Sequence, residues 1–400
     1  MLTSRGVAIG FANISHSLTH MLMLLYPTAV LGLEREWGLS YGELITLSLV
    51  GFIAFGLGAL PAGWLADKWS DVGMMAVLLF GMGSASVLTG FANSPLSIAV
   101  GLGLIGLFAS IYHPVGIAMV VRHARLRGRA LGLNGVFGGV GLATGPFVAG
   151  VLMDFSGWRA AFIVPGVATL AMGVLFLVSV RLTGLRPTRE DVSPQPEVSN
   201  KVMVSAFLIL TVTTMCAGLI FQSTSVALPK IFAQRLTFFD GSAAAIGGFV
   251  TLVYLVSACF QVLGGMAADR YPLKWVFVAS YWIQVPVLVL AASLTNVPLV
   301  IAAMVMVLLQ NGAAPSETAL FARYSPARWR ATAFGVKFVI ALGVSALGVP
   351  LVALIFEWSG GFFWLFVAMA IFASVVALVG LLLPAEGRPL VSTPAAAQGD

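Results

Sequence analysis

Twelve apolar runs, each about as long as a membrane-spanning helix, restrict the fold of this chain more than any other feature. A segment that crosses a bilayer must have its backbone hydrogen bonds satisfied, so only helices and closed barrels can span it. Barrel strands are shorter and alternate in polarity, whereas these runs are continuously apolar. They predict an all-α membrane protein with twelve transmembrane helices near residues 7–31, 41–64, 73–92, 96–121, 130–153, 160–180, 202–229, 242–266, 275–293, 298–322, 331–356 and 361–384.

Charged residues are scarce, at 9% of the chain against 59% hydrophobic residues, and most of them lie between the runs. Membrane proteins retain Lys and Arg on the cytoplasmic side. With the N-terminus inside, 16 of the 21 Lys and Arg fall in cytoplasmic segments, four fall in outer loops and Lys337 falls within a run. We expect a multi-pass protein of the cell inner (plasma) membrane with both termini cytoplasmic. Its net charge of +6 then orients helices in the lipid bilayer and does not indicate nucleic-acid binding.

A pattern of proline and arginine recurs in the second part of the chain. At an offset of 201, four positions are repeated by the same residue type: Pro114, Arg122, Arg127 and Arg129 by Pro315, Arg323, Arg328 and Arg330. Between the two copies, residues 181–201 are too polar to bury an apolar face. We expect two pseudo-symmetric six-helix halves, residues 1–180 and 202–384, joined by a cytoplasmic linker at 181–201 and followed by a cytoplasmic tail at 385–400.

Two short loops resemble the loop signature of the major facilitator superfamily, in which a glycine precedes an Asp-Arg/Lys pair. They contain Gly63 with Asp67-Lys68, and, at an offset of 202, Gly265 with Asp269-Arg270. The resemblance implies gating loops. The glycines would let two helices approach closely, and the carboxylates would latch one conformation. The first copy has Ser70 and Asp71 where a glycine and a basic residue are usual, which predicts a weaker latch. An ordinary polar turn is the alternative interpretation.

The fifth run is similar to the antiporter motif of the same superfamily. Its small residues have the motif's spacing, with one alanine in place of a glycine: Gly132, Gly141, Gly145, Pro146, Ala149 and Gly150. Small residues permit close helix packing, and a proline bends a helix. The resemblance implies an exporter, whereas general packing of small residues is the other interpretation.

The first and fourth runs resemble the fosmidomycin-resistance branch of drug exporters. The residues that carry this resemblance are Ile14-Ser15-His16, Leu25-Tyr26-Pro27 and Ile111-Tyr112-His113-Pro114. It implies proton-driven efflux of a small antimicrobial and does not specify the substrate.

Polar side chains within the runs are candidates for the transport pathway, because an ionisable group at membrane depth is costly unless it has a partner or a function. In the facilitator fold, the first, fourth, seventh and tenth helices line the central cavity. The candidates on these four helices are His16, His20, His113, Gln222, Gln310, Asn311 and Glu317.

The histidines allow more than one interpretation. His16 and His20 are four residues apart and share one helix face. Imidazole titrates near neutrality, which suits a proton carrier. A metal site is an alternative for which no further ligand cluster is found in the sequence, and a structural hydrogen bond is another. His113 precedes Pro114, so it either contacts substrate or satisfies carbonyls that the proline leaves without a donor.

Glu317 is the carboxylate placed well inside a run, and Lys337 is the corresponding lysine. A buried ion pair between consecutive helices is the structural interpretation. The functional interpretation is that Glu317 takes a proton in one facing state and pairs with Lys337 in the other. The arginine that many drug antiporters carry in the fourth span is missing, which makes these two residues the next candidates for coupling.

The sequence therefore predicts a proton-coupled secondary transporter that exports a small organic molecule or antimicrobial by alternating access. A proton-coupled importer of a small organic anion is the nearest alternative, and a non-transporting receptor on the same scaffold is another. No phosphate-binding loop, catalytic triad or metalloenzyme motif is recognised, so neither an enzyme nor a cofactor or metal is expected. The expected partners are the small-molecule substrate, protons and lipid. The sequence leaves the oligomeric state open, with a monomer as the default.

Overall fold

A computed structural model describes residues 3–125, 127–186, 200–238, 242–324, 337 and 339–384, and within them every regular element is a helix. Twelve of the helical segments are long and apolar enough to cross a membrane, and each overlaps one of the twelve predicted runs. The predicted fold class is confirmed. Most of the predicted linker, the tail, Arg328 and Arg330 and the first residues of the eleventh run lie outside the described residues.

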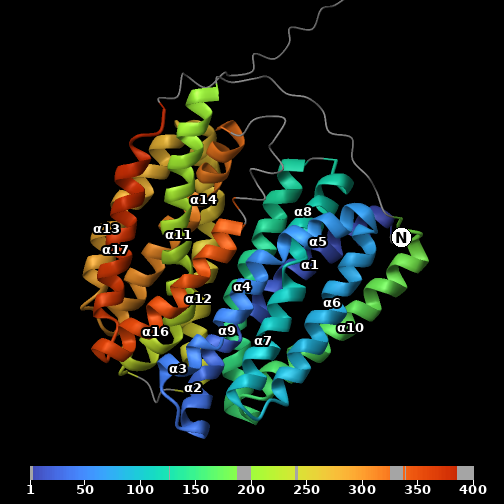
Figure 1. The fold of residues 1–400 in the computed structure, drawn as a ribbon, viewed down its shortest axis with the longest axis horizontal. Helices are drawn as coiled ribbons and strands as arrows, with labels where there is room; N and C mark the ends of the chain where they lie inside the picture. The colour runs from blue at the N-terminus through green and yellow to red at the C-terminus, as the bar shows by residue number, and fades with distance from the viewer. Residues whose placement is uncertain are drawn as a thin grey trace, which may run out of the picture.

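The first six spans form one group of helices (Figure 1). Several spans are divided into shorter helices, and the group consists of α1 (Ser4–Met23), α2 (Tyr26–Trp37), α3 (Tyr41–Thr46), α4 (Leu49–Leu57), α5 (Ala59–Lys68), α6 (Asp71–Gly90), α7 (Pro95–Ala109), α8 (Tyr112–His123), α9 (Arg127–Ser156) and α10 (Ala160–Thr183).

The last six spans form the second group, on the other side of Figure 1. It consists of α11 (Asn200–Arg235), α12 (Ala243–Arg270), α13 (Leu273–Ala291), α14 (Asn296–Tyr324), the π-helix η2 (Val339–Gly343), the 3-10 helix η3 (Val344–Leu347), α16 (Gly348–Ser359) and α17 (Phe363–Gly380). The exact boundary between the predicted halves stays a prediction.

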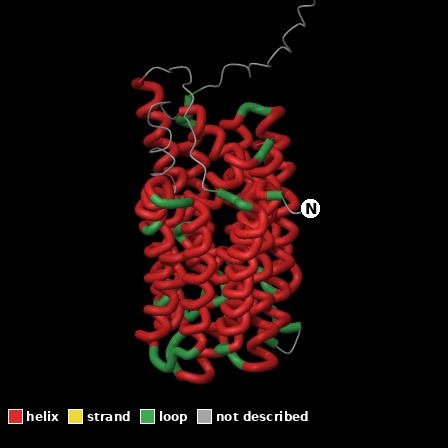
Figure 2. The backbone as a smooth tube through the Cα atoms, turned by 90° about the vertical axis from the view of Figure 1, so that its right-hand side faces the viewer, coloured by secondary structure: helices red, strands yellow, loops and turns green. Residues whose placement is uncertain are grey.

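The two groups converge towards one end of the bundle and diverge towards the other (Figure 1). We call the first the far end; it carries Glu34, Ser40, Asp154, Lys230 and Ser359. The opposite end is the linker end, where α5, α8, α10 and α12 finish. Figure 2 shows the helices running roughly parallel between the two ends, with loops at each end and short turns partway along some spans.

Prolines divide two spans close to predicted polar residues. Pro114 cannot donate a backbone hydrogen bond to the Ser110 carbonyl, and the fourth span is interrupted between α7 and α8 at that point. The first span is interrupted at Leu24 and Leu25, just before Pro27. The interruption at Pro114 leaves His113 in the first turn of α8.

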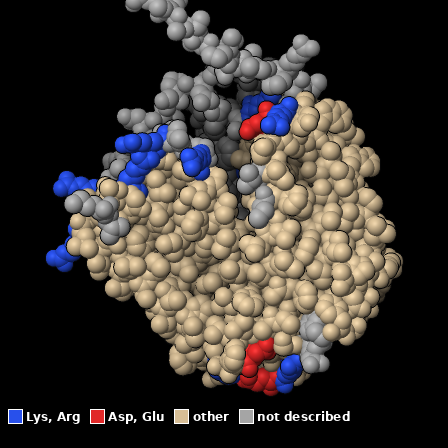
Figure 3. All heavy atoms as spheres, turned by 180° about the vertical axis from the view of Figure 1, so that it is seen from behind, with Lys and Arg blue, Asp and Glu red and all other residues tan. Residues whose placement is uncertain are grey.

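The middle of the surface is apolar and the ends are charged. Figure 3 shows Lys, Arg, Asp and Glu near the two ends and a broad tan belt between them. Large apolar side chains of the membrane-spanning helices are well exposed, for example Leu354 of α16 at 69% and Ile371 of α17 at 58%. Such a continuous apolar surface fits the hydrocarbon of a bilayer. The chain is therefore a multi-pass membrane protein.

Candidate functional site

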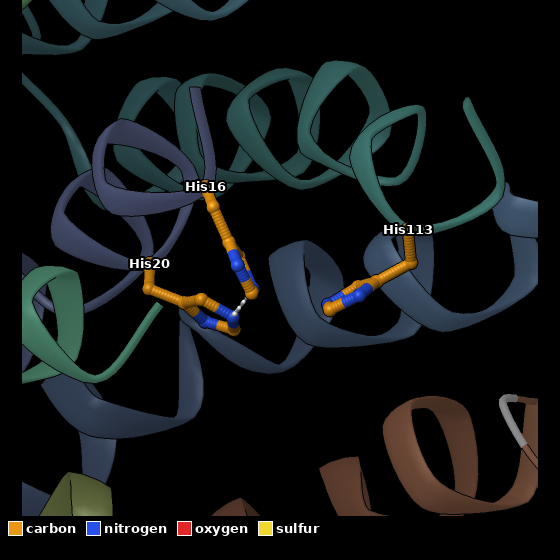
Figure 4. Close-up of side chains that lie close together, drawn as sticks. All are labelled: His16, His20 and His113. Carbon is orange, nitrogen blue, oxygen red and sulfur yellow. Dashed lines mark hydrogen bonds between the residues drawn. The ribbon is translucent and has the colours of Figure 1, made fainter. Parts of the chain in front are cut away.

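Three imidazoles from two helices meet inside the N-terminal group (Figure 4). His16 and His20 come from α1 and His113 from α8, and we call these three residues the histidine cluster. The Nε2 atoms of His16 and His20 are 3.2 Å apart, and one ring nitrogen from each of the three lies within 4.8 Å of the others. His16 is 8% exposed, whereas the other two are partly exposed. The structure thus supplies a third imidazole that the sequence analysis did not associate with the pair.

The His16 ring is held by its surroundings. Its Nδ1 lies 2.8 Å from the backbone carbonyl oxygen of Asn134, and a carbonyl only accepts, so Nδ1 carries the proton. The ring stacks on Tyr112 at a centroid distance of 4.4 Å. A Cβ at Gly138 would lie 2.6 Å from His16 Nε2, so glycine leaves the room that the ring occupies. The Nε2 of neutral His16 therefore presents a lone pair to the cluster.

Asn134 supports this arrangement and was missed by the sequence analysis. Its Nδ2 donates to Asn13 Oδ1 at 2.9 Å and to the Tyr112 hydroxyl at 2.7 Å. Asn134 itself is 2% exposed. The network ties α1, α8 and α9 together behind His16. An amide in an apolar run was a signal that could have marked this residue.

A second polar cluster lies in the C-terminal group, around Glu317 of α14. Glu317 Oε1 accepts a hydrogen bond from Thr214 at 2.5 Å, and Glu317 Oε2 is 3.8 Å from Lys337 Nζ. Lys337 also donates to Thr318 Oγ1 at 2.9 Å. The predicted proximity of Glu317 and Lys337 is thus present, but each side chain has a shorter contact with a threonine. If the pair separated, Glu317 would still contact Thr214 and Lys337 would still contact Thr318.

The three predicted amides have different surroundings. Gln310 Nε2 donates to the Ala217 carbonyl at 2.8 Å, and Asn311 Nδ2 donates to Ser257 Oγ at 3.0 Å. These two residues connect α14 to α11 and α12, which is a helix-packing role. Gln222 is 5% exposed, and its Nε2 has no hydrogen-bond acceptor among the described residues. Gln222 thus has both of its amide N–H groups available to a substrate, whereas Gln310 and Asn311 each use one of theirs.

The small residues of the fifth span face two different neighbours. Gly141 and Gly145 pack against the backbone of α1, where a Cβ at Gly145 would lie 2.9 Å from the Met21 carbonyl oxygen. Gly150 packs against the Ala243 backbone of α12, and Gly247 of α12 packs against Pro146. Gly132 has no neighbour within 4 Å of a built Cβ. Among the motif residues, Pro146 and Gly150 therefore contact the other group, whereas Gly141 and Gly145 pack within their own.

The first of the two predicted gating loops contains a carboxylate, Asp71, that its motif does not include. Asp71 is 2% exposed and accepts a hydrogen bond from Arg122 at 3.1 Å, whereas Asp67 is 3.8 Å from Arg122 and its side chain is 77% exposed. Gly63 packs against Pro114 of α8. Lys68 lies over the Trp64 ring. Asp71, which departs from the family pattern, is thus the closer partner of Arg122.

In the second loop, the glycine that packs closely is not the one expected from the motif. A Cβ at Gly265 would meet nothing within 4 Å, whereas one at Gly264 would lie 2.7 Å from the Gly312 Cα of α14. Asp269 and Arg270 are exposed at the end of α12. The close helix approach expected at Gly265 is therefore made one residue earlier, by Gly264.

At the far end, charged side chains join the two groups. Lys230 of α11 donates to both carboxylate oxygens of Glu34 of α2, at 2.6 and 2.7 Å. Glu357 of α16 accepts the Gly42 backbone N–H of α3 at 2.9 Å. Asp154 of α9 accepts the first backbone N–H groups of α12, at 3.1 and 2.8 Å. A hollow of about 530 Å³ beside these contacts is lined by Glu34, Arg35, Asp154 and Lys230, among others.

Two groups of membrane-spanning helices, closed against each other at one end, with buried polar clusters in both, define the architecture of a secondary transporter. The chain belongs to the Major Facilitator Superfamily, whose profile matches residues 9–238 and 210–399. The two matches together cover most of the chain.

Similar proteins are themselves transporters or resistance proteins. The chain is 25% identical to the 4-hydroxybenzoate transporter PcaK of Pseudomonas putida, over 82% of this chain and 79% of that protein. It is 23% identical to the gallate transporter of Pseudomonas putida, over 80% of this chain and 79% of that protein. The puromycin resistance protein pur8 of Streptomyces alboniger is 31% identical over 41% of this chain and 33% of its own length.

The fold is shared with solved structures. A bacterial homologue of the human lysosomal transporter Spinster, in an inward-facing and unoccupied conformation, matches with a TM-score of 0.75 at 14% identity, over 95% of this chain and 97% of that one. The facilitator fold is thereby confirmed. The fosmidomycin-resistance resemblance of the first and fourth runs gains no support from the relatives.

Proposed function

We propose that this protein is a proton-coupled secondary transporter that imports a small aromatic carboxylate by alternating access. The relatives that cover 82% and 80% of the chain are transporters of 4-hydroxybenzoate and of gallate. Both compounds carry a carboxylate on a hydroxylated benzene ring. The proposal therefore favours the organic-anion importer over the exporter that the antiporter motif suggested.

The observation that carries the coupling mechanism is the contact between Glu317 and Lys337. Their charged atoms are 3.8 Å apart, and both side chains are largely buried, at 14% and 9% exposed. Opposite charges attract strongly when water is excluded. A proton on Glu317 removes its negative charge, so Lys337 loses an electrostatic partner and becomes available to a substrate carboxylate. Proton and anion then load together, as symport requires.

The two threonines make this exchange possible without a large cost. Thr214 still donates to the carboxylate of Glu317 when Lys337 moves, and Thr318 still accepts from the Lys337 ammonium. A buried charge left with no polar partner would cost several kcal/mol, on the order of 3 to 5. Because each group retains a hydrogen bond, the pair can open and close during a transport cycle.

Uptake of radiolabelled 4-hydroxybenzoate into proteoliposomes tests the proposal. A gradient that is alkaline inside should drive accumulation by the unaltered protein. Glu317→Gln should retain exchange between equal compartments and lose accumulation, whereas Lys337→Met should reduce both by tenfold or more. Glu36→Gln removes a carboxylate whose partner, Arg159, is in the same group of helices, and should change neither. Gradient-driven accumulation by Glu317→Gln would place the coupling site elsewhere.

Export is the second candidate, and a specific observation favours it. The fifth span matches the antiporter motif at Gly132, Gly141, Gly145, Pro146 and Gly150, and a puromycin resistance protein is a partial relative. An exporter would move its substrate against an opposed proton gradient. Loading puromycin in the same vesicles and reversing the gradient distinguishes the two directions. Proton-driven movement of puromycin without movement of any aromatic acid would favour export.

A further inference from the structure

The histidine cluster has the geometry of a metal site. In a tetrahedral site with metal–nitrogen bonds of about 2.0 to 2.1 Å, two ligand nitrogens are about 3.3 to 3.4 Å apart. His16 Nε2 and His20 Nε2 are separated by 3.2 Å. The third ring nitrogen, from His113, lies within 4.8 Å of the other two, so each of these two distances has to shorten by at most about 1.5 Å to match. Figure 4 shows the three rings directed towards one another.

The surroundings of His16 are those of a ligand prepared for a metal. Ligating histidines usually donate their second ring N–H to a carbonyl or carboxylate, which fixes the tautomer. His16 Nδ1 donates to the Asn134 carbonyl at 2.8 Å, so Nε2 is the nitrogen with the free lone pair. Stacking on Tyr112 and the hydrogen bonds of Asn134 hold the ring in place. One ligand of the site is therefore fixed before an ion binds.

We propose that His16, His20 and His113 bind one divalent late transition-metal ion of the Zn²⁺ type. Three imidazoles suit zinc, cobalt, nickel and copper, whereas magnesium and calcium prefer oxygen ligands. Three protein ligands also leave a fourth position for an exogenous ligand, as in catalytic zinc sites. His20 and His113 are partly exposed as whole residues, whereas both ring nitrogens of His113 are buried. The site is independent of the substrate and direction proposed above.

A hydrogen bond between His20 and His16 accounts for the 3.2 Å separation without a metal. It does not account for the convergence of His113, whose ring centroid is 5.6 Å from that of His16 and 5.5 Å from that of His20. Pro114 is what sets His113 at the start of α8, where its ring faces α1. The two explanations differ in whether all three histidines are needed for the binding of an ion.

Cobalt binding to the full-length protein tests the proposal. The protein is purified in detergent with an affinity tag that contains no histidine, treated with EDTA and titrated with Co²⁺. We expect one Co²⁺ per chain with the visible absorption of a tetrahedral site, displaced by Zn²⁺ and reversed by EDTA. His20→Gln and His113→Gln should each weaken binding tenfold or more. His123→Gln is the matched control, since this histidine contacts the Met119 carbonyl outside the cluster, and it should bind as the unaltered protein does.

Thermal unfolding provides a second readout that does not depend on transport. Zn²⁺ should raise the Tm of the unaltered protein and of His123→Gln, because a ligand that binds only the folded state stabilises it. The rise should be absent in His20→Gln and His113→Gln, whose Tm without metal also shows whether they fold. Absence of stoichiometric Co²⁺ binding by the unaltered protein, or equal binding by all three variants, would overturn the site.

Discussion

The far end and the linker end of the bundle use their charged residues differently. At the far end, Glu34 pairs with Lys230, Gly42 donates to Glu357, and Asp154 caps α12, and these three contacts join the two groups of helices, whereas Glu36 pairs with Arg159 within one group. At the linker end, Arg122 pairs with Asp71 inside the N-terminal group. Lys274 there donates to the Leu381 and Leu383 carbonyls inside the C-terminal group.

This difference teaches which contacts must break during transport. Alternating access requires one end to open as the other closes. The contacts between groups at the far end stabilise the conformation seen here, in which that end is closed. The contacts of Arg122 and Lys274 stabilise each group by itself and can persist through the cycle. Variants that remove one kind of contact should therefore affect the conformational equilibrium, and variants that remove the other should affect stability.

The largest expected effect comes from filling a close backbone approach between the two groups of helices. A Cβ at Gly247 would lie 2.7 Å from the Pro146 carbonyl carbon, whereas one at Gly248 would meet only the Phe147 ring, at 3.9 Å. Gly247→Ala should prevent closure of the far end and reduce transport tenfold or more, because backbone atoms cannot rotate away. Gly248→Ala should transport normally. Equal flux for the two variants at equal protein levels would mean that closure tolerates the added methyl group.

The next largest effect is expected from removing the ion pair between Glu34 and Lys230, which joins the two groups. Glu34→Gln should shift the equilibrium away from the closed far end by about tenfold, which corresponds to about 1.4 kcal/mol, typical of a hydrogen bond to a charged group. Spin labels at Arg35 and Gln234, which both line the hollow, should report longer distances. Glu36→Gln is the matched control because Glu36 pairs with Arg159 in its own group. Identical distance distributions in the two variants would remove Glu34 from the gate.

Substitutions at the linker end should affect the transport cycle less and should clearly lower the stability. Asp71→Asn removes the buried partner of Arg122 and should destabilise the protein by about 1 to 3 kcal/mol while leaving the far-end distances unchanged. Asp67→Asn should cost less than about 0.5 kcal/mol, since its side chain is exposed and 3.8 Å from Arg122. Thermal unfolding measures both. A larger loss of stability for Asp67→Asn than for Asp71→Asn would mean that Asp67 is the main partner of Arg122.

Single-cysteine labelling, which should disturb the protein least, tests which end faces the cytoplasm. In a variant without Cys216 and Cys259, a single cysteine at Ser40 should react with an impermeant reagent only from outside the cell. One at Ser193, which lies outside the described residues, should react only from the cytoplasm. This sidedness is predicted by the distribution of Lys and Arg. Reaction with the opposite sidedness would mean that the far end faces the cytoplasm and the linker end faces outside.

The sequence determined the fold class and the number of spans, because each apolar run carries its own length and polarity. It also showed that Pro114 removes a backbone donor, which is a local property, and the fourth span is interrupted there. The pairing of His16 with His20 follows likewise from a spacing of four residues on one helix. The match of the family profile to the sequence then places the chain in its family.

Tertiary structure alone decided how residues of different spans meet. His113 joins His16 and His20, Asn134 holds His16, and Asp71 in place of Asp67 becomes the closer partner of Arg122. Likewise Gly264, and not Gly265, makes the close approach to α14. Helical periodicity fixes which side chains share a face within one helix. Which faces oppose each other depends on the depth and rotation at which separate helices pack, and those are set by contacts between residues far apart in the chain.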